Sequence, residues 1–232
     1  MNKLFPLNDE LRTYVFEHRS PEDPLLCELR TETQRVAGAS ARLQISADEG
    51  ILLGMLVSLS GARRVIEVGV FTGYSSTVMA RRLPPDGTVL CCEINEEWAS
   101  VARRYWQLAG VAGKMDLRIG PAAETLRSLP EKEIFDFAFV DADKSNYVFY
   151  YEEILKRLQP NGLIAFDNML ARGRVVDPSI QSEQTEAVRR LNELLITDRR
   201  VEAVMLHVSD GVTLVRKLSG DEAVAQPNLS CG

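Results

Sequence analysis

Cysteine is scarce in this chain, and the few cysteines form no pattern. Four occur among 232 residues: Cys91 and Cys92 are adjacent in a strand-like run, whereas Cys27 and Cys231 lie near opposite ends. Disulfide-held secreted domains and zinc sites built from cysteine pairs need characteristic cysteine spacings. The sequence therefore predicts neither a disulfide framework nor a cysteine-based metal site, and it favours reduced thiols and a cytoplasmic location.

Long apolar runs and an excess of basic charge are also absent. No run approaches the roughly 20 apolar residues of a membrane span, and residues 1–6 contain no signal-peptide apolar core. The formal net charge of -6 argues against a general binder of phosphate backbones, because such proteins usually carry a basic face. We therefore expect a soluble protein with no membrane and no nucleic-acid partner.

A third absence is the Gly-x-Gly-x-x-Gly fingerprint of dinucleotide-binding folds. The chain instead has Gly69-Val70-Phe71-Thr72-Gly73 after a strand-like run. Glycines in such a turn let the backbone approach a ligand, and the amides at the start of the next helix offer donors to it. Bulky Val70 and Phe71 leave less room for a pyrophosphate, so a nicotinamide-dependent oxidoreductase is the weaker alternative.

Glu93 ends the next strand-like run, about 20 residues after Gly73. An acid at this place can accept hydrogen bonds from the ribose hydroxyls of a nucleoside. A nucleoside cofactor without a pyrophosphate fits both Glu93 and the glycine turn. A solvated acid that caps the following helix is the plainer alternative.

Helical and strand-like segments alternate through most of the chain. With 45% hydrophobic and 26% charged residues, the chain can bury a substantial core as one α/β domain. The patterns predict helices near residues 47–59, 96–109 and 146–158, and strands near 64–68, 88–92, 115–119, 135–140 and 163–166. This alternation favours a mostly parallel sheet with helices on both faces.

The two ends of the chain depart from this alternation. Runs 201–208 and 212–217 flank Ser209-Asp210-Gly211, which predicts an antiparallel hairpin at the sheet edge. Residues 1–45 have helical patterns broken by prolines, so we expect short helices that pack on the domain or on a partner subunit. The main domain is expected over residues 46–218, followed by a flexible tail over 219–232.

Acidic and amide side chains follow two of the expected strands. Asp141-Ala142-Asp143-Lys144 comes after the run 135–140, and Asp167-Asn168 comes after the run 162–166. Together with the helix between them they look like one βαβ unit, so both strand ends share one edge, about 4.8 Å apart if the strands are neighbours. Oxygen ligands at that edge suit magnesium first, with manganese or calcium as alternatives, rather than zinc.

Each of these side chains also has a plainer interpretation. Asp141 or Asp143 could cap the helix that follows, and Lys144 could pair with one of them. Asp167-Asn168 could form an ordinary Asx turn after a strand.

Taken together, the motifs resemble the cation-dependent O-methyltransferases related to caffeoyl-CoA O-methyltransferase. The similarity spans residues 25–218 and is carried, in order, by residues 66–75, Gly120-Pro121-Ala122, residues 139–144 and Asp167-Asn168. It implies a Rossmann-like class I methyltransferase fold with a seven-stranded sheet, S-adenosylmethionine as methyl donor, and a divalent cation. It also implies a catechol-like aromatic acceptor with vicinal hydroxyls, and a homodimer.

The resemblance implies site residues position by position. Asp141, Asp167 and Asn168 would hold the metal. Lys144 and Asp141 would be the catalytic residues, with Lys144 beside the acceptor hydroxyl either as general base or as an orienting cation. The cofactor would be contacted by Ile45, Glu67, Gly69, Phe71, Gly73, Ser75, Glu93, Ala122, Asp141 and Asp143.

One departure from that family concerns the acceptor site. After Asp-Asn, family members often continue with Leu-Trp, whereas this chain has Ala171 in place of the tryptophan. We expect a roomier acceptor pocket, with Arg172 or Arg174 placed to meet an acidic substituent. The aromatic residues that follow Lys144 at helical spacing are expected mainly to pack in the core or at a dimer interface, with Tyr147 the best candidate among them to approach a ligand. A methyltransferase-like domain kept for binding, without turnover, is the non-enzymatic alternative.

Overall fold

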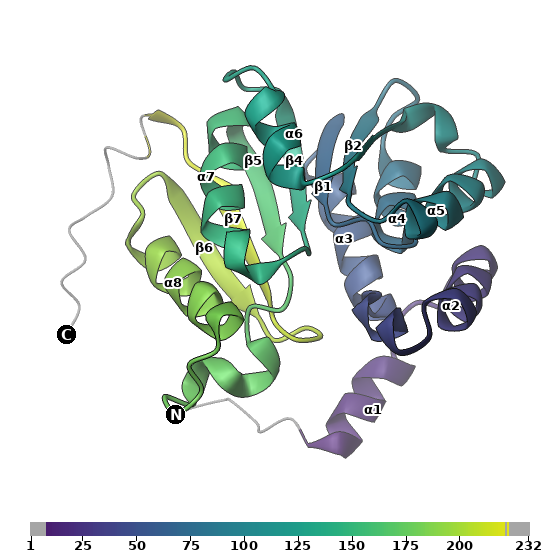
Figure 1. The fold of residues 1–232 in the computed structure, drawn as a ribbon, viewed down its shortest axis with the longest axis horizontal. Coiled ribbons are helices and arrows are strands. Elements are labelled where there is room, and N and C mark those ends of the chain that lie inside the picture. Colours follow the sequence, from purple (N-terminus) through teal and green to yellow (C-terminus); the bar gives the residue numbers. More distant parts are fainter. Residues whose placement is uncertain (1–7, 221, 223–232) are drawn as a thin grey trace.

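A seven-stranded sheet organises the part of the chain that the computed structural model describes, residues 8–220 and 222. Its strand order is β3-β2-β1-β4-β5-β7-β6 (Figure 1). Strands β1 to β5 run parallel, and β7 is antiparallel to both β5 and β6. The strands are β1 (Arg64–Val68), β2 (Thr88–Glu93), β3 (Met115–Ile119), β4 (Phe135–Val140), β5 (Leu158–Phe166), β6 (Val201–Leu206) and β7 (Val212–Lys217). The predicted fold class is confirmed, and the tail predicted from residue 219 lies almost wholly outside the described residues.

Helices cover both faces of this sheet because successive strand residues point into two separate apolar layers. Phe137 and Phe139 of β4 join one layer, whereas Ala138 and Val140 join the other. Both faces are therefore buried, which explains the nearly continuous apolar run of this strand. The first layer holds α2 (Pro24–Ala37), α3 (Ala47–Leu59), α4 (Tyr74–Arg82) and α5 (Glu96–Leu108), and the second holds α6 (Ala122–Ser128), α7 (Tyr147–Arg157) and α8 (Glu183–Thr197).

Two predicted strand boundaries differ from the structure. β5 begins at Leu158 rather than at residue 163, because Leu158 already pairs with Phe135 of β4. The register then shifts before Leu163 pairs with Phe137, and the intervening residues include Asn161 at φ 65. The first hairpin strand ends at Leu206 rather than at residue 208. The turn that follows contains Ser209 at φ 51 and Gly211 at φ 86, a left-handed backbone that ends the strand early.

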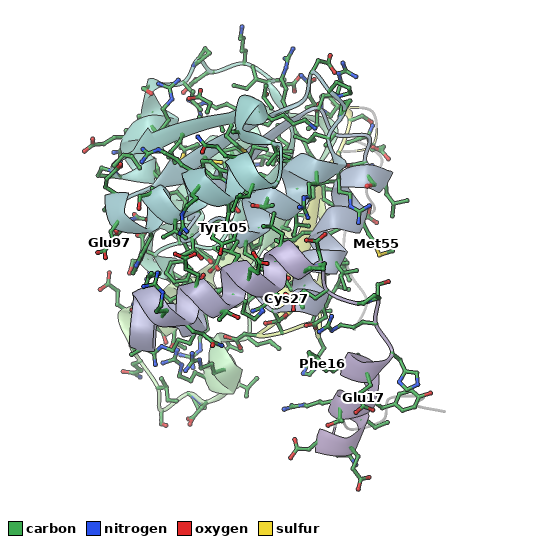
Figure 2. The ribbon with its side chains drawn as sticks, turned by 90° about the vertical axis from the view of Figure 1, so that its right-hand side faces the viewer. Phe16, Glu17, Cys27, Met55, Glu97 and Tyr105 are labelled. Carbon is green, nitrogen blue, oxygen red and sulfur yellow. The ribbon has the colours of Figure 1, made fainter. Side chains whose placement is uncertain are left out.

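The N-terminal region contains the expected short helices, of which α2 packs on the domain and α1 does not. Helix α2 buries Leu26, Leu29 and Thr33, and the short 3-10 helix η1 (Gly38–Leu43) follows it. Helix α1 (Asp9–Glu17) has no buried residue and stands apart from the rest of the chain (Figure 2). No helix among the described residues combines the length and the apolarity that a membrane span requires.

The predicted βαβ unit is confirmed at the place where the acidic residues lie. β4 and β5 are parallel neighbours, and their register pairs Val140 with Phe166. Asp141 and Asp167 are the next residues of the two strands, and the amide of Asp167 donates to the Val140 carbonyl at 3.1 Å. The two aspartates therefore lie next to each other at the carboxyl ends of these strands.

Candidate active site

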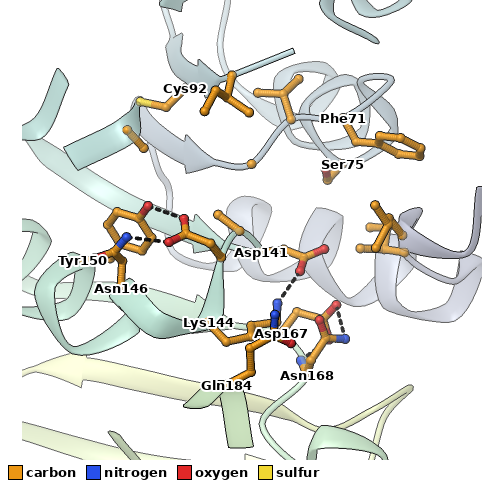
Figure 3. Close-up of a pocket in the computed structure, with 18 of the residues that line it drawn as sticks. Phe71, Ser75, Cys92, Asp141, Lys144, Asn146, Tyr150, Asp167, Asn168 and Gln184 are labelled. Atoms are coloured by element: carbon orange, nitrogen blue, oxygen red, sulfur yellow. Dashed lines mark hydrogen bonds and ion pairs between the residues drawn. The ribbon is translucent and has the colours of Figure 1, made fainter. Parts of the chain in front are cut away.

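A pocket of about 900 Å³ opens along the carboxyl ends of the central strands. Parallel α/β sheets commonly bind ligands at this edge, where the strand order reverses direction between β1 and β4. Figure 3 shows Asp141, Lys144, Asp167 and Asn168 gathered on one side of the pocket, with Phe71 and Ser75 across from them. One end of the pocket is thus formed by the glycine turn and the other by the acidic strand ends.

The glycine turn after β1 is held in a backbone that requires glycine. Gly69 has φ +92, and a Cβ added to it would lie 2.1 Å from the backbone oxygen of Asp141. Gly73 has φ +88 and is the N-cap residue of α4. A Cβ added to it would lie 2.7 Å from the Cβ of Ala102. The two glycines therefore let the turn lie directly against the loop after β4 and against α5.

Glu93 fixes the same turn from the end of β2. One of its carboxylate oxygens accepts the amides of Val70 at 3.0 Å and Phe71 at 2.7 Å, and the other accepts those of Ile94 and Asn95. Its side chain nevertheless lines the pocket, whereas the N-cap of α5 is Asn95. A ribose hydroxyl bound here would share the carboxylate with these amides.

The residues assigned to the cofactor from the resemblance divide into two groups in the structure. Glu67 and Gly73 are buried and do not line the pocket. The others line the pocket: Ile45, Gly69, Phe71, Ser75, Glu93, Ala122, Asp141 and Asp143. The ring of Phe71 packs edge-on against Trp98 at 4.7 Å between centroids, which gives the pocket a rigid aromatic wall.

Glu67 is fully buried on β1, and its carboxylate is only partly satisfied by hydrogen bonds. One carboxylate oxygen has no hydrogen-bond partner, and the thiol of Cys91 lies 3.9 Å from the other. Burial raises the pKa of Glu67 from 4.5 to about 8, because it outweighs the hydroxyls of Ser75 and Ser76, which lower the pKa, and the charges of Glu93 and Asp141 add to it. The side chain therefore favours its neutral form in the folded state at neutral pH.

We expect Glu67→Gln to become more stabilising as the pH rises. In the folded protein Glu67 keeps its proton up to about pH 8, whereas in the unfolded chain it loses the proton near pH 4.5. The free energy of unfolding of wild type therefore falls as the pH rises between these two values. From pH 5 to pH 9 the free energy of unfolding of the variant should gain on the order of 3 kcal/mol relative to wild type. Urea unfolding at several pH values measures this, with exposed Glu97→Gln as the matched control. Parallel profiles for Glu67→Gln and wild type would contradict it.

The side chains predicted to hold a metal converge at the other end of the pocket. Asp167 is 3% exposed, and its two oxygens accept the backbone amide of Asn168 at 2.5 Å and its side-chain amide at 2.9 Å. Burial and the charge of Asp141 raise the pKa of Asp167 to about 7. In the described part of the chain no three His, Cys, Asp or Glu side chains form a metal site. A cation at this end would therefore need the Asn168 oxygen together with the two aspartates.

Lys144 is the counter-charge to these acids. Its ammonium donates to Asp141 at 2.8 Å and to the hydroxyl of Tyr147 at 2.5 Å. Burial lowers the pKa of Lys144, but the charge of Asp141 and these hydrogen bonds outweigh it and raise the pKa well above its ordinary value. Lys144 is therefore a cation in this arrangement, and the ion pair considered from sequence is present.

The tyrosines of α7 pack in the core as expected, but the one that reaches the pocket is not the one expected. Tyr147 is fully buried beneath Lys144, and its hydroxyl lies 3.1 Å from the Asp167 carbonyl as a donor. Tyr150, rather than Tyr147, lines the pocket, and its hydroxyl donates to Asp143 at 2.6 Å. Tyr147 is the first residue of α7, directly after η3 (Lys144–Asn146), and its hydroxyl is held against the strand ends by the carbonyls of Val140 and Asp167.

Glu49 is a fourth acid of this region that the sequence did not single out. It lies in the first turn of α3, is fully buried, and has no hydrogen-bond partner at either carboxylate oxygen. Burial and the charges of Asp167 and Asp141 raise the pKa of Glu49 to about 10. In the sequence it is one of two acids at a helix start, and only the packing of α3 beside the strand ends distinguishes it from Asp48.

Comparison with known proteins identifies the family of this chain. The O-methyltransferase family model matches residues 16–218. The chain belongs to this family. A caffeoyl-CoA O-methyltransferase of Zea mays is 42% identical over 225 residues, which cover 91% of this chain and 84% of the relative. A catechol O-methyltransferase domain-containing protein of Mus musculus is 37% identical over 219 residues, which cover 93% and 82%.

Solved structures of O-methyltransferases share the same fold. One from Streptomyces achromogenes, involved in tomaymycin synthesis and solved in complex with S-adenosylmethionine, has a TM-score of 0.82 and 32% identity over 90% of this chain and 96% of that chain. One from Bacillus cereus, in complex with S-adenosylhomocysteine, has a TM-score of 0.79 and 31% identity over 90% and 97%. The enzyme class predicted from the motifs is confirmed, and the oxidoreductase alternative loses its basis.

Proposed function

We propose that this O-methyltransferase transfers a methyl group from S-adenosylmethionine to a hydroxyl of a catechol-like small aromatic acceptor, with the help of a divalent cation. The observation that carries the proposal is the convergence of Asp141, Asp167, Asn168 and Lys144 at one end of the pocket whose other end is the glycine turn. The relatives named above, which include a caffeoyl-CoA O-methyltransferase and an enzyme solved with S-adenosylmethionine, support the same reaction.

The residues at the acidic end fit a hard divalent cation. Two carboxylates and one amide oxygen form an oxygen-only donor set, which suits magnesium, manganese or calcium. Burial and the charge of Asp141 raise the pKa of Asp167, and a bound cation would favour the charged form of this carboxylate. Asp141, Asp167 and Asn168 would hold the ion, and a bound ion would make an acceptor hydroxyl easier to deprotonate.

The protein's own part in the reaction is positioning. Phe71, Ser75 and Glu93 would hold the methyl donor along the glycine turn, together with Ala122, which also lines the pocket. Lys144, fixed by Asp141 and Tyr147, would orient the acceptor oxygen and stabilise its negative charge. The oxygen–carbon bond would form as the carbon–sulfur bond breaks, and proximity of this kind contributes about 7 to 11 kcal/mol. The raised pKa of Lys144 favours this orienting role over that of a general base.

Removal of the divalent cation tests the proposal directly. We expect methyl transfer from labelled S-adenosylmethionine to a panel of catechols to stop with a chelator and to return with added magnesium. Cofactor binding, followed in parallel by calorimetry, shows whether the pocket remains intact. Transfer that persists in the chelator would contradict the metal requirement, and cofactor binding with no transfer to any acceptor would support a domain kept for binding.

We also propose a cytoplasmic homodimer. Helix α1 has no buried residue and exposes apolar side chains that a second copy could cover: Leu11, Tyr14, Val15 and Phe16. Three cysteines in the described residues, two of them buried, are free thiols, which suits a reducing compartment. Light scattering should give twice the chain mass of 25.9 kDa, and a monomer at micromolar concentration would contradict the dimer.

A further inference from the structure

Three arginines line the pocket from two segments that are far apart in sequence. Arg42 belongs to η1, and Arg172 and Arg174 belong to η4 (Ala171–Val176). All three side chains are exposed although they line the pocket, so they lie at its opening rather than at its base. The described acids of the pocket's catalytic end, Asp141 and Asp167, are by contrast shielded from solvent.

These arginines are not neutralised within the described residues. None of them forms an ion pair there, and the one side-chain bond among them runs from Nε of Arg174 to the Ala171 carbonyl at 2.9 Å. Arg189 of α8 is a useful contrast: it donates to the carbonyls of Val175 and Ile180 and pairs with Glu186. Arg189 therefore holds the η4 region together, whereas the guanidinium groups at the opening make only the one bond from Arg174 and no ion pair within the described residues.

The backbone that carries Arg172 is nevertheless fixed. Its amide donates to the Asp210 carboxylate at 2.6 Å, and the amide of Leu170 donates to the Asp210 carbonyl at 2.9 Å. Ala171 at φ 47 and Arg172 at φ 57 adopt a left-handed backbone that non-glycine residues seldom keep without support from their surroundings. An exposed arginine on an anchored backbone can bind an anion with less loss of conformational freedom than one on a free loop.

The charges of the pocket are thus arranged in two layers. The shielded carboxylates of Asp141 and Asp167 lie at the base and three arginines lie at the opening. At the opening the carboxylate of Asp210 accepts the Arg172 amide. The formal net charge of the whole chain is -6. Guanidinium groups bind carboxylate and phosphate oxygens through paired donors. Ala171 lines the pocket and is 6% exposed, and its side chain occupies less space than the tryptophan that related enzymes often have at this place.

We propose that the acceptor carries an anionic group, a carboxylate or a phosphate, on the side of its ring away from the reacting hydroxyls, and that Arg42, Arg172 and Arg174 bind this group. The inference rests on the proposed function, because it assumes that the hydroxyls lie at the acidic end. It makes the three arginines determinants of acceptor choice rather than catalytic residues.

Binding of matched ligands tests the proposal without requiring turnover. The probes are 3,4-dihydroxybenzoate, its neutral methyl ester, and a catechol that carries a phosphomonoester. Each is titrated calorimetrically into protein loaded with magnesium and S-adenosylhomocysteine. For wild type we expect an anionic probe to bind about tenfold more tightly than the ester, because each exposed cation contributes about two- to fivefold. The preferred anion tells carboxylate from phosphate.

The variants show whether the arginines cause the preference. The triple variant Arg42→Gln, Arg172→Gln, Arg174→Gln should bring the affinity ratio of anion to ester close to one, whereas Arg190→Gln, an exposed arginine of α8 that does not line the pocket, should leave it unchanged. Equal affinities in wild type, or a ratio that survives in the triple variant, would overturn the inference. Methyl transfer to the ester, with no preference for an anionic probe, would support the proposed function and contradict the anion site. Binding that depends on the anionic group, with no methyl transfer to any probe, would support the anion site and contradict the proposed function.

Discussion

Asp167→Asn is expected to reduce methyl transfer by about a thousandfold or more, which corresponds to about 4 kcal/mol of transition-state stabilisation. The substitution keeps the shape of the side chain but removes one of the two carboxylates proposed to hold the cation. The remaining Asp141 is already paired with Lys144 at 2.8 Å, so little negative charge would be left to retain a divalent ion. Rates over a range of magnesium concentrations, together with manganese titration followed by electron paramagnetic resonance, measure both effects.

The same variant should remain folded, and this separates a functional loss from a structural one. Burial and the charge of Asp141 raise the pKa of Asp167, so the metal-free protein holds this carboxylate at a cost that the neutral amide avoids. Without metal, Asp167→Asn should therefore unfold at the wild-type temperature or above it. Asp177→Asn, an exposed acid bonded to Ser179, is the matched control and should change neither property. Wild-type transfer at ordinary magnesium concentrations in Asp167→Asn would contradict the assigned metal site.

The position of Asp141 beside Asp167 could be predicted because it follows from topology alone. Two apolar runs joined by a helix must be parallel, and parallel strands end at one edge, so residues that follow the two strands meet there. The register of the sheet pairs Val140 with Phe166, so the residues that follow them, Asp141 and Asp167, lie next to each other. The glycine turn could be located in the same way, since strand, glycines and helix follow each other directly in the chain.

Contacts between distant elements could not be predicted from the sequence. Glu49 is brought to the aspartates by the packing of α3, and the hydroxyl of Tyr147 is held at the strand ends by backbone carbonyls. The bonds from Glu93 to the amides of the glycine turn likewise depend on the spacing of β1 and β2 in space. These features depend on tertiary packing, which periodicity and local motifs do not specify.

Gly69→Ala is expected to destabilise the protein by about 2 to 5 kcal/mol, combining the cost of a left-handed backbone with that of overpacking. The new methyl carbon would lie 2.1 Å from the Asp141 backbone oxygen and 2.8 Å from its carbonyl carbon. Both are backbone atoms of the adjoining loop, so no side-chain rotation can relieve the clash. The turn or the loop after β4 must move, and because the amide of Asp141 donates to the Val68 carbonyl at 2.9 Å, just before the turn, we expect the movement to displace Asp141.

Thermal and urea unfolding measure the loss of stability, and calorimetry measures the accompanying loss of S-adenosylmethionine binding. Gly113→Ala is the matched control, because an added Cβ at Gly113 meets nothing within 4 Å and should change stability by no more than about 0.5 kcal/mol. The turn and the acidic end share the contact between Gly69 and Asp141, so the variant should weaken cofactor binding and metal binding together. Loss of cofactor binding with an unchanged manganese affinity would show that the turn alone moves, and that the two ends of the pocket are positioned independently.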